Sequence, residues 1–221
     1  VEVRDDLKYL TAGDNEYVAK SVIIATGSEH KLLNIPGEEQ FSGKGVSYCA
    51  VCDGAFFRNK EVIVIGGGDS AIEEALYLSN LVSKVTIIHR RDELRAQKIL
   101  RDRAFAKENI HFIWDSIPLE IKGERKVSSV EIRNVKTGEE SSVSADGIFI
   151  YVGMLPQTED FKTLGITNEA GYIPTNEKLE TKVAGIFAAG DVREKEIRQV
   201  ITAASDGAIA AQSAYNYVEG L

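Results

Sequence analysis

The two cysteines of this 221-residue sequence, Cys49 and Cys52, form a single Cys-x-x-Cys motif. A disulfide between them would close too short a loop to remove much entropy from the unfolded chain, so it would add little stability. Zinc needs four ligands, and the three histidines do not have the spacing of ligands. The motif is therefore predicted to be redox-active, with one thiolate as the nucleophile. Asp53 follows directly and is a candidate proton donor for the leaving sulfur, although an Asp-Gly pair is also common in turns.

A glycine motif, Gly66-x-Gly68-x-x-Ala71, follows the β-branched run of residues 61–65 and precedes a helical pattern of apolar residues. In this context the glycines allow a pyrophosphate to approach the backbone N–H groups at a helix N-terminus. The pattern predicts a dinucleotide site, with Asp69 and Ser70 as further candidates in the first helical turn. A tight strand-to-helix turn without a ligand is the alternative.

Two arginines directly follow the predicted end of the second strand of this unit. Residues 84–88 are again β-branched, and they lead into His89, Arg90 and Arg91. An enzyme that selects NAD usually has an acid here for the ribose 2′-hydroxyl, whereas guanidinium groups suit the 2′-phosphate of NADPH. Arg95 lies one helical turn further on. The predicted cofactor is NADPH, and a solvated helix face is the alternative reading of the arginines.

A nicotinamide transfers two electrons as a hydride, which a disulfide cannot accept directly. NADPH and a Cys-x-x-Cys motif in one chain therefore imply a flavin between them. Two further motifs, Ala25-Thr26-Gly27 and Ala188-Ala189-Gly190-Asp191-Val192, each follow an apolar strand. Taken in order, all these motifs closely resemble the low-molecular-weight bacterial type of thioredoxin reductase.

This resemblance implies an α/β fold of two Rossmann-like, three-layer domains. An NADPH domain, residues 44–153, would carry the Cys-x-x-Cys motif and would be inserted into an FAD domain formed by residues 1–43 and 154–221. The implied cofactors are NADPH and FAD, and the implied partner is thioredoxin or a thioredoxin-like protein. The family also implies a homodimer.

The resemblance further implies a role for individual residues. Cys52 would face the flavin, Cys49 would attack the thioredoxin disulfide, and Asp53 would move a proton to or from the thiols. FAD would be contacted by Gly27, Gly190, Asp191, Arg198 and Gln199. Within that set, Asp191 would accept a hydrogen bond from the ribityl chain. A strand-end turn at Gly27 and a helix cap at 190–191 are the alternatives.

Patterns elsewhere in the chain predict the remaining elements. Two strands, 2–10 and 16–24, should form a hairpin, and residues 127–135 and 140–144 a second one. A helix is expected over 92–107, followed by a strand at 111–114, and an apolar strand over 147–153. The Ala-rich stretch 198–220 is predicted to be a helix that packs through its apolar positions, Val200, Ile201, Ala204, Ile209 and Tyr215.

Composition limits the possible partners. The 34 acidic residues outnumber the 26 Lys and Arg residues, which gives a net charge of -8 and no overall attraction to nucleic acid or an anionic bilayer. No apolar run approaches the roughly 18 residues that a membrane helix needs, so the expected location is the cytoplasm.

One departure from the family concerns the start of the chain. The family begins with an FAD fingerprint of the G-x-G-x-x-G type, and no such segment precedes Val1. The sequence is therefore expected to lack its natural N-terminus, and this chain alone to hold an incomplete FAD site and to be inactive. Two alternatives follow: a flavoprotein of the same fold that reduces a peroxiredoxin, which usually selects NADH, and a non-catalytic module that binds only NADPH.

Overall fold

The computed structural model describes residues 1–220, which divide into two compact units. The disulfide unit is His30–Gly153, and the split unit is Val1–Glu29 together with the chain from Met154 onward. The chain passes from one unit to the other twice. The second passage, between Gly153 and Met154, is where the sequence predicts it, but the first lies between Glu29 and His30 rather than near residue 43. The reason is that the segment from 30 to 45 bonds into the disulfide unit, where Pro36 and Lys44 accept hydrogen bonds from backbone N–H groups of residues 121 and 127.

The disulfide unit is built on a five-stranded sheet with the order β6-β13-β7-β8-β9, in which every pairing is parallel. Its strands are β6 (Val46–Ser47), β7 (Glu61–Gly66), β8 (Lys84–Ile88), β9 (Ile110–Ile113) and β13 (Gly147–Tyr151). The β-branched side chains of 62–65 and 85–88 are almost fully buried, as expected for strands covered on both faces. The predicted parallel strand-turn-helix-strand unit is therefore present.

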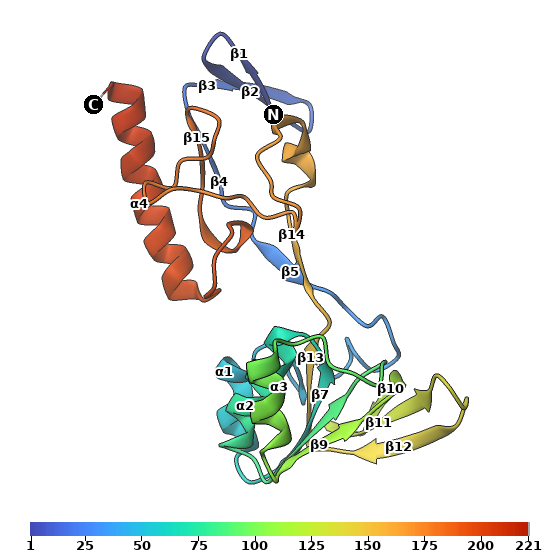
Figure 1. Ribbon diagram of the computed structural model, residues 1–221. Coiled ribbons are helices and arrows are strands. Elements are labelled where there is room, and N and C mark those ends of the chain that lie inside the picture. Colours follow the sequence, from blue (N-terminus) through green and yellow to red (C-terminus); the bar gives the residue numbers. More distant parts are fainter. Residues whose placement is uncertain (221) are drawn as a thin grey trace. The chain divides into compact units, whose positions relative to one another are not determined.

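Two different layers cover the faces of this sheet (Figure 1). Helices α2 (Asp69–Ser79) and α3 (Lys98–Phe105) pack on one face, where Val62 and Val64 lie in the core. On the other face, Ile63 and Ile65 pack against an antiparallel sheet of β10 (Ser116–Gly123), β11 (Val127–Asn134) and β12 (Glu140–Ser144). Alternate residues of one strand thus supply two separate cores.

The helix predicted over 92–107 is wrong in its first part, because α3 begins only at Lys98. Backbone N–H groups before that point bond to the glycine motif instead of to a helical turn. Arg95 N donates to the Gly67 carbonyl at 2.8 Å, and Gln97 N donates to Asp69 Oδ1 at 2.7 Å. The segment between β8 and α3 is therefore a loop that lies along the glycine motif.

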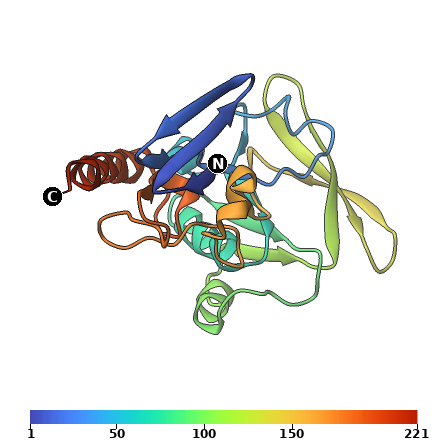
Figure 2. The same ribbon diagram turned by 90° about the horizontal axis from the view of Figure 1, so that it is seen from above.

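The split unit contains two small sheets, and a further pair of strands lies where the chain passes between the units. Strands β1 (Glu2–Arg4), β2 (Leu7–Ala12) and β3 (Asn15–Ala19) form an antiparallel sheet, drawn in blue in Figure 2. The predicted hairpin thus exists between β2 and β3, and β1 adds a third strand. The segment predicted to extend its second strand instead forms β4 (Val22–Ile24), which pairs in parallel with β15 (Ile186–Ala188). The further pair is β5 (Ser28–His30) with β14 (Met154–Pro156).

The C-terminal helix α4 (Val200–Glu219) is present, but the face predicted to pack is wrong. Val200 and Ile201 are 88% and 77% exposed, and Ile209 and Tyr215 are also exposed. The buried positions are Asp206, Ala210 and Ala214, which repeat every four residues along one side. Small side chains allow this side to lie close to Phe187 and Ala189, so size rather than hydrophobicity selects the packed face.

Short helical turns complete the chain: α1 (Ala50–Asp53) and the 3-10 helices η1 (Gly54–Phe57), η2 (Glu159–Leu164) and η3 (Gly190–Val192). Within residues 1–220, no helix combines the length and the apolar character needed to cross a membrane.

A candidate redox and nucleotide site

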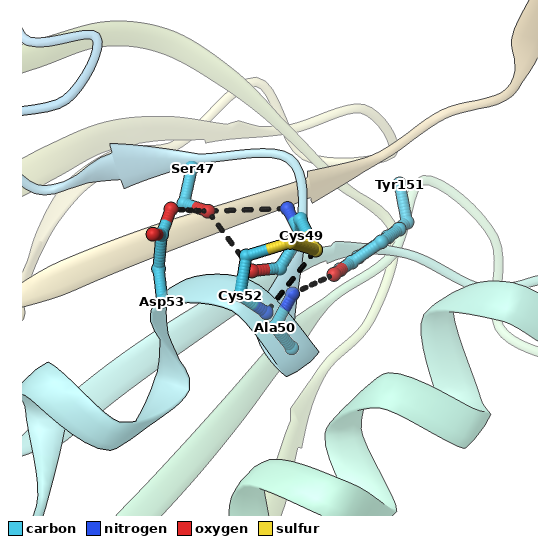
Figure 3. Close-up of a disulfide and its surroundings, with 6 residues drawn as sticks. All are labelled: Ser47, Cys49, Ala50, Cys52, Asp53 and Tyr151. Atoms are coloured by element: carbon cyan, nitrogen blue, oxygen red, sulfur yellow. Dashed lines mark hydrogen bonds between the residues drawn. A yellow bond between two sulfur atoms is a disulfide. The ribbon is translucent and has the colours of Figure 1, made fainter. Parts of the chain in front are cut away.

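Cys49 and Cys52 form a disulfide in the structure (Figure 3). Cys49 is the N-cap of helix α1, and its Sγ accepts a hydrogen bond from Cys52 N at 3.2 Å. A donor aimed at a sulfur stabilises negative charge there, and the thiolate is the reactive form of a cysteine. Of the two sulfurs, this geometry favours Cys49 as the nucleophile. The part of the chain that the structure describes contains no cluster of ligands that could hold a metal ion.

Ser47 connects the disulfide with Asp53. Its hydroxyl donates to Asp53 Oδ2 at 2.7 Å and accepts from Cys49 N at 3.1 Å (Figure 3). Ser47 is buried at the end of β6, so the hydroxyl is fixed in place. The Asp53 carboxylate is thereby held beside the redox pair, in a position suited to the proton transfer expected of it.

Tyr151, the last residue of strand β13, binds the start of helix α1. Its hydroxyl accepts a hydrogen bond from Ala50 N at 2.7 Å, and Ala50 is completely buried (Figure 3). Burial raises the pKa of the Tyr151 phenol above its usual range, and the nearby Glu74 carboxylate raises it further. The group therefore stays protonated at neutral pH. Burial also raises the pKa of Glu74, whose Oε2 is buried without a hydrogen-bond partner.

A cavity of about 380 Å³ opens at the glycine motif. Part of it is polar, lined by Gly66, Gly67, His89, Arg90, Arg95, Ser116 and Tyr151. The other lining residues are mostly apolar and come from the chain around 32–35, from the ends of β7 and β8, and from residues 117, 118 and 152. Helix α2 starts at this motif with Gly68 as N-cap and without a side-chain cap, so its first N–H groups are available to an anion.

His89 is buried beside this motif and its Nε2 has no hydrogen-bond partner. Burial lowers the pKa of His89, and the positive charges of Arg95, Arg91 and Arg90 lower it further. The imidazole is therefore neutral at pH 7. A Cβ on Gly67 would lie 2.5 Å from Cε1 of this ring, so the position requires glycine because the ring is packed against it.

Not every predicted nucleotide residue lines the cavity. Arg91 is exposed outside the lining, and its carbonyl accepts a hydrogen bond from Asp115 N at 3.2 Å. The Asp69 carboxylate accepts two hydrogen bonds from Gln97, which hold the loop before α3. Gly68 and Ser70 lie at the start of α2, next to the lining.

The predicted FAD residues of the split unit gather at one sheet edge. Strands β4 and β15 are parallel, so Gly27 and Gly190 follow the same end of the pair. Both glycines have positive φ, 75° and 77°. Asp191 comes next, and its Oδ1 is buried without a partner.

Asp206 of α4 forms ion pairs next to this edge with two cations from the segment after η3. Asp206 is buried and accepts from Gly190 N at 3.0 Å, while Arg193 and Lys195 each approach its carboxylate at 2.8 Å. Burial opposes ionisation of Asp206, but the two cations hold its pKa below the usual value.

Arg198 and Gln199 lie at the N-terminus of α4. The Arg198 guanidinium lies 4.4 Å from the centre of the Tyr172 ring, and its Nε is buried without a partner. Gln199 is the N-cap of the helix and forms a capping box with Thr202.

The sequence matches a family model described as pyridine nucleotide-disulphide oxidoreductase over residues 2–207. It is 58% identical to the thioredoxin reductase of Bacillus subtilis (strain 168) and 56% identical to that of Listeria innocua. Each match covers 98% of this chain, and 69% and 68% of the respective relative. The crystal structure of thioredoxin reductase from Streptococcus pyogenes superposes with a TM-score of 0.94 at 54% identity, covering 100% of this chain and 72% of that one.

The chain belongs to the thioredoxin reductase family. The reductase is thus an NADPH-dependent flavoprotein disulfide reductase with a redox-active cysteine pair, and its fold is that of the Rossmann-like FAD and NAD(P) domains. These predictions from the sequence are confirmed.

The residues of the reductase fit both cofactors. The uncapped helix start, the glycine motif and Arg90 and Arg95 suit a phosphorylated dinucleotide. In the split unit, the buried and unpartnered Asp191 Oδ1 is an acceptor suited to a hydroxyl group, and Arg198 Nε is a donor that a ligand can satisfy.

The residues of the site that were not predicted from the sequence include Ser47, Gly67 and Tyr151. Ser47 ends a strand of only two residues, too short to leave a periodic signal. Gly67 is the variable position of the glycine motif. Tyr151 could have been found, because the last residue of a buried parallel strand lies at the edge where such sheets bind ligands.

Proposed function

We propose that the Cys49–Cys52 pair reduces the disulfide of thioredoxin or a thioredoxin-like protein, with Cys49 as the attacking sulfur and Cys52 as the sulfur that faces the flavin. The observation that carries this proposal is the Cys49–Cys52 disulfide, with Asp53 held beside it by Ser47, in the same compact unit as the glycine-lined cavity. We further propose that the disulfide unit is the NADPH domain and the split unit the FAD domain.

The reaction with the partner is a two-step thiol–disulfide exchange. The Cys49 thiolate attacks one sulfur of the partner disulfide, which forms a mixed disulfide and releases the partner's other sulfur as a thiolate. Cys52, deprotonated, then attacks the Cys49 sulfur, which closes the 49–52 disulfide and releases the second partner thiolate. Asp53 takes the proton from Cys52 and returns it to a leaving sulfur.

The cofactors return the pair to its dithiol form. FAD, when bound, supplies the conversion of a hydride from NADPH into the two electrons that a disulfide accepts. In this proposal Arg90, Arg91 and Arg95 bind the NADPH 2′-phosphate, and the N–H groups at Gly66, Gly68, Asp69 and Ser70 meet the pyrophosphate. His89 packs against the turn. Gly27, Gly190, Asp191, Arg198 and Gln199 would contact FAD, with Asp191 as an acceptor for a ribityl hydroxyl.

The roles of the two sulfurs can be tested without either cofactor. Reduced Cys52→Ser, freed of dithiothreitol, should form a stable mixed disulfide with a thioredoxin variant that keeps only the attacked cysteine, activated as its thionitrobenzoate mixed disulfide. Cys49 displaces thionitrobenzoate, and neither protein then has a second thiol that can resolve the product. Reduced Cys49→Ser should not. Trapping by Cys49→Ser alone would reverse the assignment, and trapping by neither variant would contradict thioredoxin as the partner.

The same assay tests the partner class. A single-cysteine peroxiredoxin activated in the same way should be trapped by Cys52→Ser far more slowly than thioredoxin, and faster trapping of peroxiredoxin than of thioredoxin would favour the alternative reductase. We also propose that the protein works in the cytoplasm as a homodimer. Sedimentation of the purified protein tests the second point, and a monomer at micromolar concentration would contradict it.

A further inference from the structure

Tyr151 touches both halves of the candidate site. Its hydroxyl accepts the Ala50 N–H, one residue after Cys49, and the same residue lines the cavity at the glycine motif. Both contacts lie inside the disulfide unit.

The sheet order explains this position. Strand β13 lies between β6, which leads into the Cys-x-x-Cys motif, and β7, which leads into the glycine motif. All three strands are parallel, so their carboxyl ends share one edge. The last residue of β13 must therefore lie between the two motifs, and that residue is Tyr151.

The contact with the glycine motif is close. Tyr151 is the register partner of Gly66, and a Cβ on Gly66 would lie 3.2 Å from the Tyr151 carbonyl carbon. The residue that carries the phenol is therefore part of the cavity wall, and only two rotatable bonds separate its backbone from its hydroxyl.

The hydrogen bond from Ala50 N to the Tyr151 hydroxyl satisfies a donor of helix α1 that has no partner within the helix. The N–H groups of a helix's first turn have no partner within the helix, and Ala50 is the first residue of α1. Ala50 is completely buried, so water cannot replace the Tyr151 hydroxyl. The hydrogen bond therefore fixes the turn that carries both sulfurs in the arrangement seen with the disulfide closed.

We propose that Tyr151 is a positioning residue that couples occupancy of the nucleotide cavity to the thiol–disulfide equilibrium of Cys49 and Cys52. This inference rests on the proposed nucleotide site. A nucleotide that restrains Tyr151 favours the arrangement in which its hydroxyl holds Ala50, and so favours the disulfide over the dithiol. By linkage, the disulfide form binds the nucleotide more tightly by the same factor.

The test uses 2′-phospho-ADP-ribose, which lacks the nicotinamide and cannot exchange electrons. The full chain is equilibrated anaerobically with mixtures of reduced and oxidised dithiothreitol, with and without this probe. Reduction of the protein disulfide takes two electrons and two protons from one dithiothreitol, which becomes the cyclic disulfide. Acid quenching, alkylation and mass determination then give the dithiol fraction directly, because the chain has only two cysteines.

The probe should lower the dithiol-to-disulfide ratio about fivefold, the effect of one hydrogen bond between neutral groups. Calorimetry should find the probe about fivefold tighter on the oxidised protein than on the reduced protein. In Tyr151→Phe both differences should disappear, while the probe still binds.

Tyr48→Phe is the matched control. Tyr48 precedes Cys49 directly, but its hydroxyl donates to Glu38 and the residue does not line the cavity. This variant should keep the fivefold coupling. The inference is overturned if the probe binds the parent protein equally in both redox states, or if Tyr151→Phe retains the coupling. Those results leave the proposed function intact, whereas failure of the probe to bind at all would overturn both.

Discussion

A methyl group added at Gly67 should destabilise the disulfide unit. The new Cβ would lie 2.5 Å from Cε1 and 2.7 Å from Cγ of His89, well inside normal contact distance. His89 is 5% exposed, and its backbone N–H donates to Ile113 O at 2.9 Å, so the residue cannot move away freely. Overpacking of this kind costs about 1–3 kcal/mol.

A loss of that size is measurable. At about 2–4 °C per kcal/mol for a chain of this length, the melting temperature of Gly67→Ala should fall by about 2–12 °C. Thermal unfolding followed by circular dichroism gives this shift, and calorimetric titration with NADP⁺ gives the accompanying loss of nucleotide affinity. That loss is expected because displacing His89 also displaces Arg90, which follows it at the cavity.

Gly68→Ala separates packing from binding. The nearest atom to a Cβ at Gly68 is a terminal nitrogen of Arg95 at 3.8 Å, and the residue has φ −95°, which alanine adopts without strain. Its melting temperature should therefore fall by less than half of the Gly67→Ala shift, although a methyl group at the helix start still weakens NADP⁺ binding. Equal melting temperatures for the two variants would refute the packing argument.

Three further predictions concern charge. Replacing Arg90 and Arg91 with Ala should remove most of the preference for NADPH over NADH, at about 1.5–3 kcal/mol for each lost bond to phosphate, and unchanged discrimination in paired titrations would contradict this. Asp206→Asn leaves two mostly buried cations without a carboxylate, so urea unfolding should show a loss of about 3–5 kcal/mol, whereas an unchanged midpoint would contradict a stabilising role of these ion pairs. The pKa of His89 is lowered in the folded state. Its contribution to the free energy of unfolding is therefore complete above the unfolded pKa of 6.5 and is lost as the pH falls through the folded pKa. His89→Gln should flatten this part of the stability–pH curve, and the same slope in both proteins would contradict it.

The sequence predicts the central sheet of the disulfide unit well because each of its main strands is continuously apolar. Residues 62–65 are all Val or Ile and residues 85–88 are all β-branched, which is typical of a strand buried on both faces, and the glycines between them require a tight turn. Local pattern and tertiary structure agree here, so the positions of the glycine motif and of His89 follow from spacing alone.

Prediction fails where tertiary contacts override a local pattern. Residues 92–97 have helical spacing, but their N–H groups are taken by the Gly67 carbonyl and the Asp69 carboxylate. In α4 the large apolar residues suggest the packed face, yet the packed side is the one with small side chains and the buried Asp206. The groups that decide these structures, Gly67 and Asp69 in the first case and Phe187 and Ala189 in the second, lie outside the segments. The residues of each segment alone therefore do not reveal the contact.

The site as a whole follows from sheet topology rather than from any single motif. Four parallel strands, β6, β13, β7 and β8, are neighbours in that order and end at one edge. The residues at or just beyond those ends are respectively the Ser47 and Cys-x-x-Cys group, Tyr151, the glycine motif and His89 with Arg90. The sequence contains all four groups but not the strand order, and it is the insertion of β13 between β6 and β7 that places one tyrosine between a disulfide and a nucleotide cavity. A change in the occupancy of that cavity can therefore reach the sulfurs through one side chain.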